Sequence, residues 1–237
     1  MPRIAHQSMA DFMSINSTID SSSAQARAMD RMYGVQRHFY DLTRAYYLLG
    51  RDHLIKTLLP PEQGTVLEIG CGTGRNLVAA ARQYPKVKFF GFDISTVMLE
   101  TAGRTVQRNQ LVGRVSLAQA DASDFNAMKT FGVENFDRVF FSYTLSMIPA
   151  WQTAIEQGLK ALKPGGEMHI VDFGQCERLP RFARYMLYMW LRRFHVQPRQ
   201  ELAACLHDLS VKTGAAITVT PLFRGYAVMA KVTKPAD

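Results

Sequence analysis

The sequence is organised around the stretch Val66-Leu67-Glu68-Ile69-Gly70-Cys71-Gly72-Thr73-Gly74-Arg75-Asn76. The apolar run that ends at Ile69 predicts a buried strand, because parallel strands covered on both faces are continuously hydrophobic. The alternating glycines that follow permit a tight turn with positive φ and let a ligand approach the backbone closely. Good helix formers come directly after them. Strand, glycine turn and helix together predict a nucleotide-type site at the C-terminal edge of a parallel sheet.

The spacing of the glycines narrows the choice of nucleotide. A dinucleotide fingerprint reads G-x-G-x-x-G, and its third glycine would stand where this chain has Arg75. A P-loop needs Gly-Lys-Ser/Thr at the start of the helix, and this chain lacks it. Asp93 ends a second apolar run, and a carboxylate there can accept hydrogen bonds from both hydroxyls of a ribose. A ribose-binding acid without a pyrophosphate cradle predicts S-adenosylmethionine as the cofactor.

Length and composition favour one α/β domain with additions in a reducing cytoplasm. The 237 residues are enough for a full core, and no apolar run approaches the ~20 residues of a membrane-spanning helix. Cys71, Cys176 and Cys205 form no C-x-x-C pair, which indicates neither a disulfide framework nor a zinc site. The net charge of +8 favours an anionic partner, namely nucleic acid, an anionic membrane or an acidic substrate, unless the charge is simply dispersed.

The chain divides into three parts by pattern. Residues 1–23 are polar and serine-rich and predict a flexible arm. Residues 24–59 have helical periodicity with a break near Gly50, and their many tyrosines and arginines suggest a cap over the cofactor site. Pro60-Pro61 ends this helical region, and residues 60–237 form the catalytic domain, with an insertion at 175–198.

The alternation of strands and helices in the third part predicts a Rossmann-like, doubly wound parallel sheet. Strands are expected near residues 65–70, 87–92, 114–119, 137–142 and 167–173, and helices over 74–84, 95–109, 150–162 and 199–213, with Ser95 as an N-cap. Apolar and polar residues alternate in two final runs, 217–220 and 226–232, which predicts a closing antiparallel hairpin. The sheet should therefore have seven strands, the last of them antiparallel.

Two further segments lie where strands end and the site should be. Asp121 follows the third strand, where its carboxylate can accept from an adenine amine while the next backbone N–H donates to the ring; it can equally cap the turn. Met98 can pack on the adenine face or serve as plain core. Residues 140–149 follow the fourth strand and lack the Asn-Pro-Pro-Tyr element of many DNA adenine and cytosine N-methyltransferases, which argues against a nucleic-acid base as substrate.

These segments together resemble a known superfamily. The glycine stretch, Asp93, Asp121 and Leu162-Lys163-Pro164-Gly165-Gly166 are similar to class I S-adenosylmethionine-dependent methyltransferases over roughly residues 60–173. Adding 40–52 and 142–149, the chain resembles the N-methyltransferases of bacterial betaine-lipid synthesis. That resemblance implies trimethylation of the amine of diacylglyceryl homoserine to give diacylglyceryl-N,N,N-trimethylhomoserine.

The same resemblance implies a set of cofactor contacts. The glycines should line the cofactor, Asp93 the ribose and Asp121 the adenine. Arg51 suits the methionyl carboxylate because an arginine fork binds a carboxylate through two hydrogen bonds. The expected cofactor site comprises Tyr40, Arg51, Glu68, Gly70, Cys71, Gly72, Gly74, Asn76, Asp93, Ile94, Met98, Asp121, Ala122 and Ser142.

The acceptor side needs a neutral amine held in line with the methyl group, and it needs no strong base. Tyr40 and Tyr143 are the candidates for positioning the amine, with His38 behind them as a proton relay. A quaternary ammonium product cannot donate hydrogen bonds, so aromatic faces suit it as walls. Tyr33 and Trp151 are further candidates for those walls, although core packing explains each aromatic residue equally well.

The insertion independently suggests a lipid substrate. Residues 178–200 contain no acidic residue and six arginines. At helical spacing one face gathers Leu179, Phe182, Met186, Met189, Trp190 and Phe194, and the opposite face gathers Arg181, Arg184, Tyr188 and Arg192, with Arg193 intruding on the apolar side. Such a helix is typical of proteins that lie in an anionic membrane interface, here the inner face of the cell membrane. The alternative is a helix packed on its own domain or on a second subunit.

Other functions stay open on the sequence alone. Phosphatidylethanolamine N-methylation shares fold, cofactor and membrane helix, and C-methylation of a membrane quinone is a further possibility. An RNA methyltransferase has only the positive charge in its favour, so the prediction is a lipid partner and no nucleic acid. A non-catalytic S-adenosylmethionine-binding module is disfavoured because the cofactor-contact positions look intact.

Overall fold

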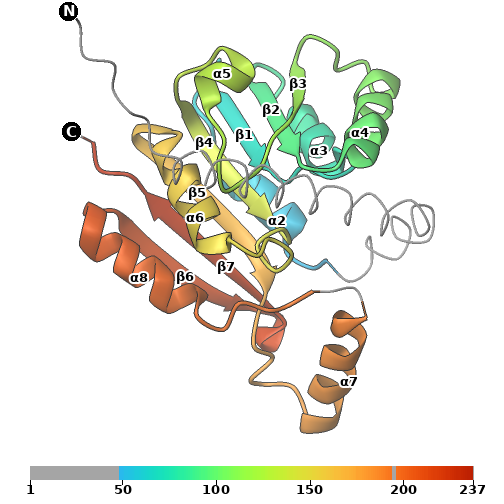
Figure 1. Cartoon of the computed structure of the whole chain (residues 1–237), viewed down its shortest axis with the longest axis vertical. Coiled ribbons are helices and arrows are strands. Elements are labelled where there is room, and N and C mark those ends of the chain that lie inside the picture. Colours follow the sequence, from blue (N-terminus) through green and yellow to red (C-terminus); the bar gives the residue numbers. More distant parts are fainter. Residues whose placement is uncertain (1–47, 194–195, 237) are drawn as a thin grey trace, which may run out of the picture.

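The computed structural model of the chain describes residues 48–193 and 196–236 (Figure 1). The predicted arm, most of the predicted cap and the candidate residues Tyr33, His38 and Tyr40 lie outside the described residues. The arm and the cap therefore stay predictions.

The described residues form one seven-stranded sheet, as predicted (Figure 1). Its strands are β1 (Thr65–Ile69), β2 (Lys88–Asp93), β3 (Val115–Gln119), β4 (Phe136–Ser142), β5 (Leu162–Phe173), β6 (Ala216–Leu222) and β7 (Ala227–Thr233). Their order is β3-β2-β1-β4-β5-β7-β6. The first five strands are parallel, and β7 pairs antiparallel with both β5 and β6. The chain therefore has the doubly wound fold with an antiparallel closing hairpin.

Helices cover both faces of the sheet and divide the core in two. They are α2 (Arg51–Thr57), α3 (Arg75–Gln83), α4 (Thr96–Arg108), α5 (Ala127–Phe131), α6 (Trp151–Lys160), α7 (Arg181–Arg192) and α8 (Leu202–Thr213). One core cluster holds side chains of α2, α3 and α4, and the other holds side chains of α5, α6 and α8. Alternate residues of β1 go to opposite clusters, because successive side chains of a strand point to opposite faces.

Local signals in the sequence set several helix starts. Gly50, at the predicted break, has φ 90° and precedes α2. Gly74 has φ 74° and precedes α3, and a left-handed conformation at these positions favours glycine. Ser95 caps α4 as predicted, because its side chain accepts a hydrogen bond from the backbone N–H of Met98.

Some boundaries differ from the prediction. The fifth strand begins at Leu162 rather than 167, because Pro164-Gly165 is included in β5 as an irregularity near the shift of its register with β4. Gly165, at φ 69°, donates to the carbonyl of Pro235 across 3.1 Å, which keeps this bend tied to the end of the sheet. The last long helix begins at Leu202 instead of 199. The short helices α5 and η1 (Phe223–Gly225) were not anticipated.

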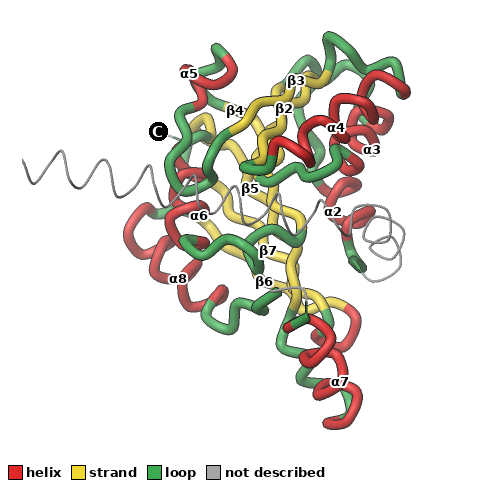
Figure 2. Tube along the Cα trace, turned by 45° about the vertical axis from the view of Figure 1, so that its right-hand side comes forward, coloured by secondary structure: helices red, strands yellow, loops and turns green. Residues whose placement is uncertain are grey.

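Helix α7 projects from the body of the domain beyond the end of the sheet (Figures 1 and 2). Its inner side rests on the α2 side of the core through Leu187, Tyr188 and Leu191. Tyr188 also donates to the carbonyl of Gln175 across 3.2 Å. Every helix among residues 48–193 and 196–236 is too short or too polar to cross a bilayer.

Candidate functional site

A pocket lies at the C-terminal ends of β1, β2 and β4, where the sequence predicted the cofactor. Its lining comes from the glycine turn, from the ends of neighbouring strands and from the loop after β4. It comprises Leu48, Arg51, Glu68, Gly70, Cys71, Gly72, Thr73, Arg75, Asn76, Phe92, Asp93, Ile94, Ala120, Asp121, Ala122, Ser142, Tyr143, Thr144, Met147 and Ile148. The topology therefore brings segments from positions 48 to 148 to one edge of the sheet.

The glycines of the turn serve two purposes. Gly70 has φ 72°, and a Cβ atom there would lie 2.1 Å from Cγ2 of Thr144, so only glycine fits beneath the loop after β4. Gly72 has φ 52° and faces open space, since a Cβ atom there would meet nothing within 4 Å. Gly72 lines the pocket, so the bare backbone at this point leaves room for a ligand.

Asp93 is fixed at the end of β2 by the backbone on both sides. Its Oδ2 accepts from the N–H of Gly72 across 2.8 Å, and its Oδ1 accepts from the N–H of Ser95 across 3.0 Å. A carboxylate oxygen can accept more than one hydrogen bond, including one from a hydroxyl. The carboxylate therefore holds the glycine turn in shape and presents an oriented pair of acceptors to the pocket.

Glu68 places a buried carboxyl group at the back of the pocket. Its side chain is 1% exposed, and its Oε1 accepts from Nδ2 of Asn76 across 2.8 Å. Its Oε2 has no hydrogen-bond partner among the described residues. Burial raises the pKa of Glu68 to about 8, with a smaller contribution from the charge of Asp93 and an opposing one from Arg51. A cation bound beside Glu68 would restore its ionised form.

The charge of the pocket fits a cationic ligand. Glu68, Asp93 and Asp121 all line it, and the first two repel one another electrostatically. The pyrophosphate of a dinucleotide would meet the same repulsion, whereas a sulfonium with an α-ammonium group would relieve it. Arg51, which is 9% exposed and donates to the carbonyl of Leu48 across 3.2 Å, supplies a cation for a ligand carboxylate.

Asp121 follows β3 and is held by a local turn. Its Oδ1 accepts from the backbone N–H of Ser123 across 2.8 Å and from the Ser123 hydroxyl across 2.7 Å. The turn-capping role and the predicted place in the pocket are therefore compatible, since both Asp121 and Ala122 belong to the lining.

The loop after β4 forms the wall opposite the glycine turn. Tyr143 is 3% exposed, has φ 56° and donates its hydroxyl proton to the carbonyl of Leu49. Burial, with the nearby charge of Asp172, raises its pKa well above the ordinary value for tyrosine. Tyr143 therefore lines the pocket with its hydroxyl proton already donated, and the neutral phenol is a poor proton acceptor for general-base work. The left-handed backbone of a bulky residue is strained, as is common at functional loops.

Three predicted residues lie outside the pocket lining. Gly74 packs α3 against α4, since a Cβ atom there would lie 3.1 Å from Cβ of Ala102. Met98 is 3% exposed and turned into the core, which is the alternative that its helical spacing allowed. Trp151, proposed as an aromatic wall, is 4% exposed and belongs to the core cluster on the α6 side.

Other lining residues were missed by sequence reasoning. Arg75 was considered only as a departure from the dinucleotide pattern, although its place directly after the last glycine at the start of α3 puts it beside any ligand of the turn. Thr144, Met147 and Ile148 belong to the segment that was expected to line the site, but no pattern distinguished them individually.

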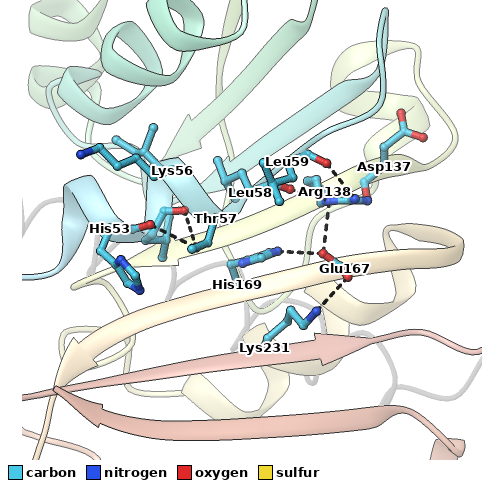
Figure 3. Close-up of polar contacts among 12 residues, drawn as sticks. His53, Lys56, Thr57, Leu58, Leu59, Asp137, Arg138, Glu167, His169 and Lys231 are labelled. Carbon is cyan, nitrogen blue, oxygen red and sulfur yellow. Dashed lines mark hydrogen bonds and ion pairs between the residues drawn. The ribbon is translucent and has the colours of Figure 1, made fainter.

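A second cluster of charged side chains lies on β4, β5 and β7 beside α2, outside the pocket lining (Figure 3). Glu167 accepts from Lys231 across 3.1 Å and from Nε2 of His169 across 3.2 Å, and its Oε2 lies 3.5 Å from Nε of Arg138. Arg138 also donates to the carbonyls of Leu58, across 2.7 Å, and Leu59, across 3.0 Å. These groups neutralise one another, so the cluster joins the end of α2 to the sheet and carries no sign of a ligand site.

Comparison with known proteins agrees with this geometry. Residues 66–166 match the family described as "Methyltransferase domain". Over 124 residues the chain is 32% identical to ribosomal RNA small subunit methyltransferase C of Escherichia coli, a match that covers 52% of this chain and 35% of that protein. The chain thus spans about a third of the length of the curated relatives that it matches.

Solved structures show the same fold at low identity. The YcgJ protein of Bacillus subtilis superposes with a TM-score of 0.62 at 18% identity, covering 79% of this chain and 99% of that one. Phosphoethanolamine N-methyltransferase 2 of Haemonchus contortus, solved with S-adenosyl-L-methionine, gives a TM-score of 0.61 at 19% identity, covering 78% and 52% of the two chains. Residues 66–166 therefore match a methyltransferase domain in sequence, and the strand order and the solved structures agree with a Rossmann-like methyltransferase fold, which supports S-adenosylmethionine as the cofactor.

Proposed function

We propose that this chain is an N-methyltransferase that trimethylates the amine of diacylglyceryl homoserine at the inner face of the cell membrane. S-adenosylmethionine, when bound, supplies the electrophilic methyl group. Asp93 and Asp121 would hold the ribose and adenine, Glu68 and Asn76 the cationic end, and Arg51 the carboxylate. The chain's own task is to hold a neutral amine in line with that methyl group and to exclude water.

The observation that carries a membrane substrate is the outer face of α7. Phe182 is 75% exposed, Tyr185 62%, Met186 50% and Met189 53%, although large apolar side chains of a helix normally face a core. The helix packs by its other side, so the part of the chain that the structure describes leaves these residues uncovered. Trp190, predicted with them, is half-buried against the core and is the exception.

The charge around this face suits an anionic surface. Three arginines are exposed here: Arg181 at the start of α7, Arg192 at its end and Arg193 directly after it. Each basic residue beside an anionic membrane contributes about 1 kcal/mol of attraction. An apolar face with arginines at its borders binds the headgroup region of a bilayer rather than spanning it.

The choice of an amine acceptor has weaker support. The described residues that line the pocket include neither a histidine nor a lysine, and the hydroxyl of Tyr143 is already donated to Leu49. The predicted relay His38 lies outside the described residues. A neutral amine can react in such a site once it is positioned. The homoserine headgroup itself rests on the resemblance of residues 40–52, 70–76 and 142–149 to the betaine-lipid enzymes, and phosphatidylethanolamine is the closest alternative acceptor.

RNA methylation is a second candidate, favoured by the ribosomal RNA relative and by the net charge of +8. That match covers 52% of this chain. A basic protein that acts on RNA should bind it with a steep dependence on salt concentration.

The test offers purified protein and labelled S-adenosylmethionine three acceptors in parallel: vesicles with diacylglyceryl homoserine, vesicles with phosphatidylethanolamine, and ribosomal RNA. Mass spectrometry should find three methyl increments on the homoserine lipid. Methylated phosphatidylethanolamine would instead identify that lipid as the acceptor. Labelled RNA with unlabelled lipids would reject a lipid acceptor.

A matched pair of variants tests the role of α7. The triple variant Phe182→Ser/Met186→Ser/Met189→Ser should lose sedimentation with anionic vesicles. The control Val112→Ser/Met128→Ser removes apolar side chains that are 73% and 54% exposed elsewhere on the domain, and it should sediment like the wild type. Equal sedimentation of both variants would reject the proposed membrane face.

A further inference from the structure

The segment that follows α7 is hydrogen-bonded to the wall of the pocket. The backbone N–H of Gln197 donates to the carbonyl of Ser146 across 3.0 Å. Arg199 donates from Nε to the carbonyl of Leu145 across 2.9 Å and from Nη2 to the carbonyl of Ile148 across 2.7 Å. The segment after α7 and the loop after β4 are therefore joined directly.

The other side of this loop is held by β5. Ser146 donates its backbone N–H to Oδ2 of Asp172 across 3.1 Å, and Asp172 is 2% exposed. The Arg199 guanidinium also lies 5.9 Å from the ring centre of Trp151, at the start of α6. The loop that supplies Thr144, Met147 and Ile148 to the pocket thus has its shape set from the strand and from the segment after α7.

The geometry points to Arg199 as a positioning residue, which fixes the pocket wall at residues 144–148 and couples the docking of α7 to the shape of that wall. The docking itself rests on the function proposed above. A planar guanidinium can bind two carbonyls at a fixed separation, which a single ammonium cannot do.

The anchoring of α7 explains how a change there can reach the wall. Leu191 is 1% exposed and Val196 is 6% exposed, and the N–H of Val196 donates to the carbonyl of Leu191 across 3.2 Å. The inner end of the helix and the start of the connecting segment are therefore packed as one unit on the core. Burying the outer face of α7 in a membrane should restrict this unit and, through Arg199, the wall.

Hydrogen exchange measures this coupling without any methyl acceptor. Backbone amides of residues 143–150 are followed with and without phosphatidylglycerol vesicles in the wild type, Arg199→Gln, Arg199→Lys and the control Arg104→Gln, which replaces an exposed arginine on α4. Vesicles should slow exchange in the wild type and the control by about threefold or more. Arg199→Gln should lose this protection while sedimenting with vesicles like the wild type, and Arg199→Lys should recover part of it.

Kinetics distinguish positioning from a general loss of structure. Arg199→Gln should raise KM for the lipid acceptor about tenfold or more, and Arg199→Lys should restore part of that change. Vesicle protection that is absent in the wild type, or equal in Arg199→Gln, would overturn the coupling. Protection without methylation of any lipid would instead leave the coupling standing and reject the proposed acceptor.

Discussion

Two groups of carboxylates lie at different places on the same sheet, and they differ in how their charge is balanced. Glu167 lies beside two cations of the chain itself, Arg138 and Lys231 (Figure 3). Asp137 pairs with a third, Lys163. At the pocket, Glu68 and Asp93 lie close enough to repel one another, and the buried Oε2 of Glu68 has no hydrogen-bond partner among the described residues.

This difference in charge balance is reflected in the pKa values of the two groups of carboxylates. A paired carboxylate has a lowered pKa despite some burial, as hydrogen bonds from Lys231 and Lys163 and the nearby charges produce at Glu167 and Asp137. A carboxylate buried without its cation has a raised pKa, as at Glu68. S-adenosylmethionine is itself a cation, so its binding beside Glu68 would favour the ionised carboxylate.

The largest expected contrast comes from neutralising one carboxylate of each group. Asp93→Asn should weaken S-adenosylmethionine binding about 100-fold, because it removes the charge and one of the acceptors that shape the glycine turn. Glu167→Gln should change that affinity by less than about twofold while lowering the free energy of unfolding by about 1–2 kcal/mol. Calorimetric titration and thermal unfolding of both variants make the comparison, and similar losses of affinity in the two would contradict the division.

The next effect concerns the stability of the protein at acid pH and the charged cluster around Glu167. Burial lowers the pKa of His169 to about 4, although its contact with Glu167 works in the opposite direction. The folded state holds the neutral ring of His169. The contribution of this ring to the free energy of unfolding is therefore present above the ordinary pKa of 6.5 and is lost as the pH falls from there towards 4. The loss should approach about 3 kcal/mol at the acid end. Chemical unfolding at a series of pH values should show it, and His169→Phe should flatten this part of the profile.

A smaller effect tests Glu68 at the pocket. Since a bound cation favours ionised Glu68, binding of S-adenosylmethionine below pH 8 should release a proton. The affinity should rise by up to about tenfold per pH unit and level off above that pH. Glu68→Gln separates this titration from any in the cofactor, and calorimetry in buffers of different ionisation enthalpy counts the protons. An unchanged proton release in the variant would show that Glu68 is not the group.

The smallest effect is expected where a pair is exposed. Lys163 contacts Asp137 across 2.9 Å, but its side chain is 46% exposed. Lys163→Met should cost less than about 1 kcal/mol of stability, because solvent screens such pairs, and it should leave cofactor affinity untouched. A large loss in thermal unfolding would mean that this pair, rather than the buried part of the group, holds the sheet edge.

Much of the fold could be read from the residues. The continuous apolar runs, the glycine turn and the final alternating runs predicted the seven strands and the antiparallel hairpin, because periodicity and turn chemistry are local properties. Gly70, Gly72 and Asp93 were likewise expected at the ends of strands from local sequence alone, and all three line the pocket. Met98 and Gly74 lie outside the pocket lining, and helical spacing alone does not say whether a residue meets a ligand or another helix.

The sequence by itself therefore determined the sheet, the cofactor edge and an amphipathic helix of arginines and aromatic residues. Only the tertiary structure decided which side of α7 meets the core, leaving Phe182 and Met186 outside and Trp190 half-buried. Likewise, only the tertiary structure brought Arg199 to Leu145, 54 residues away in the chain. The physical reason is that hydrophobic periodicity specifies a face but not its partner, and hydrogen bonds to backbone carbonyls leave no mark in the identity of the accepting residues.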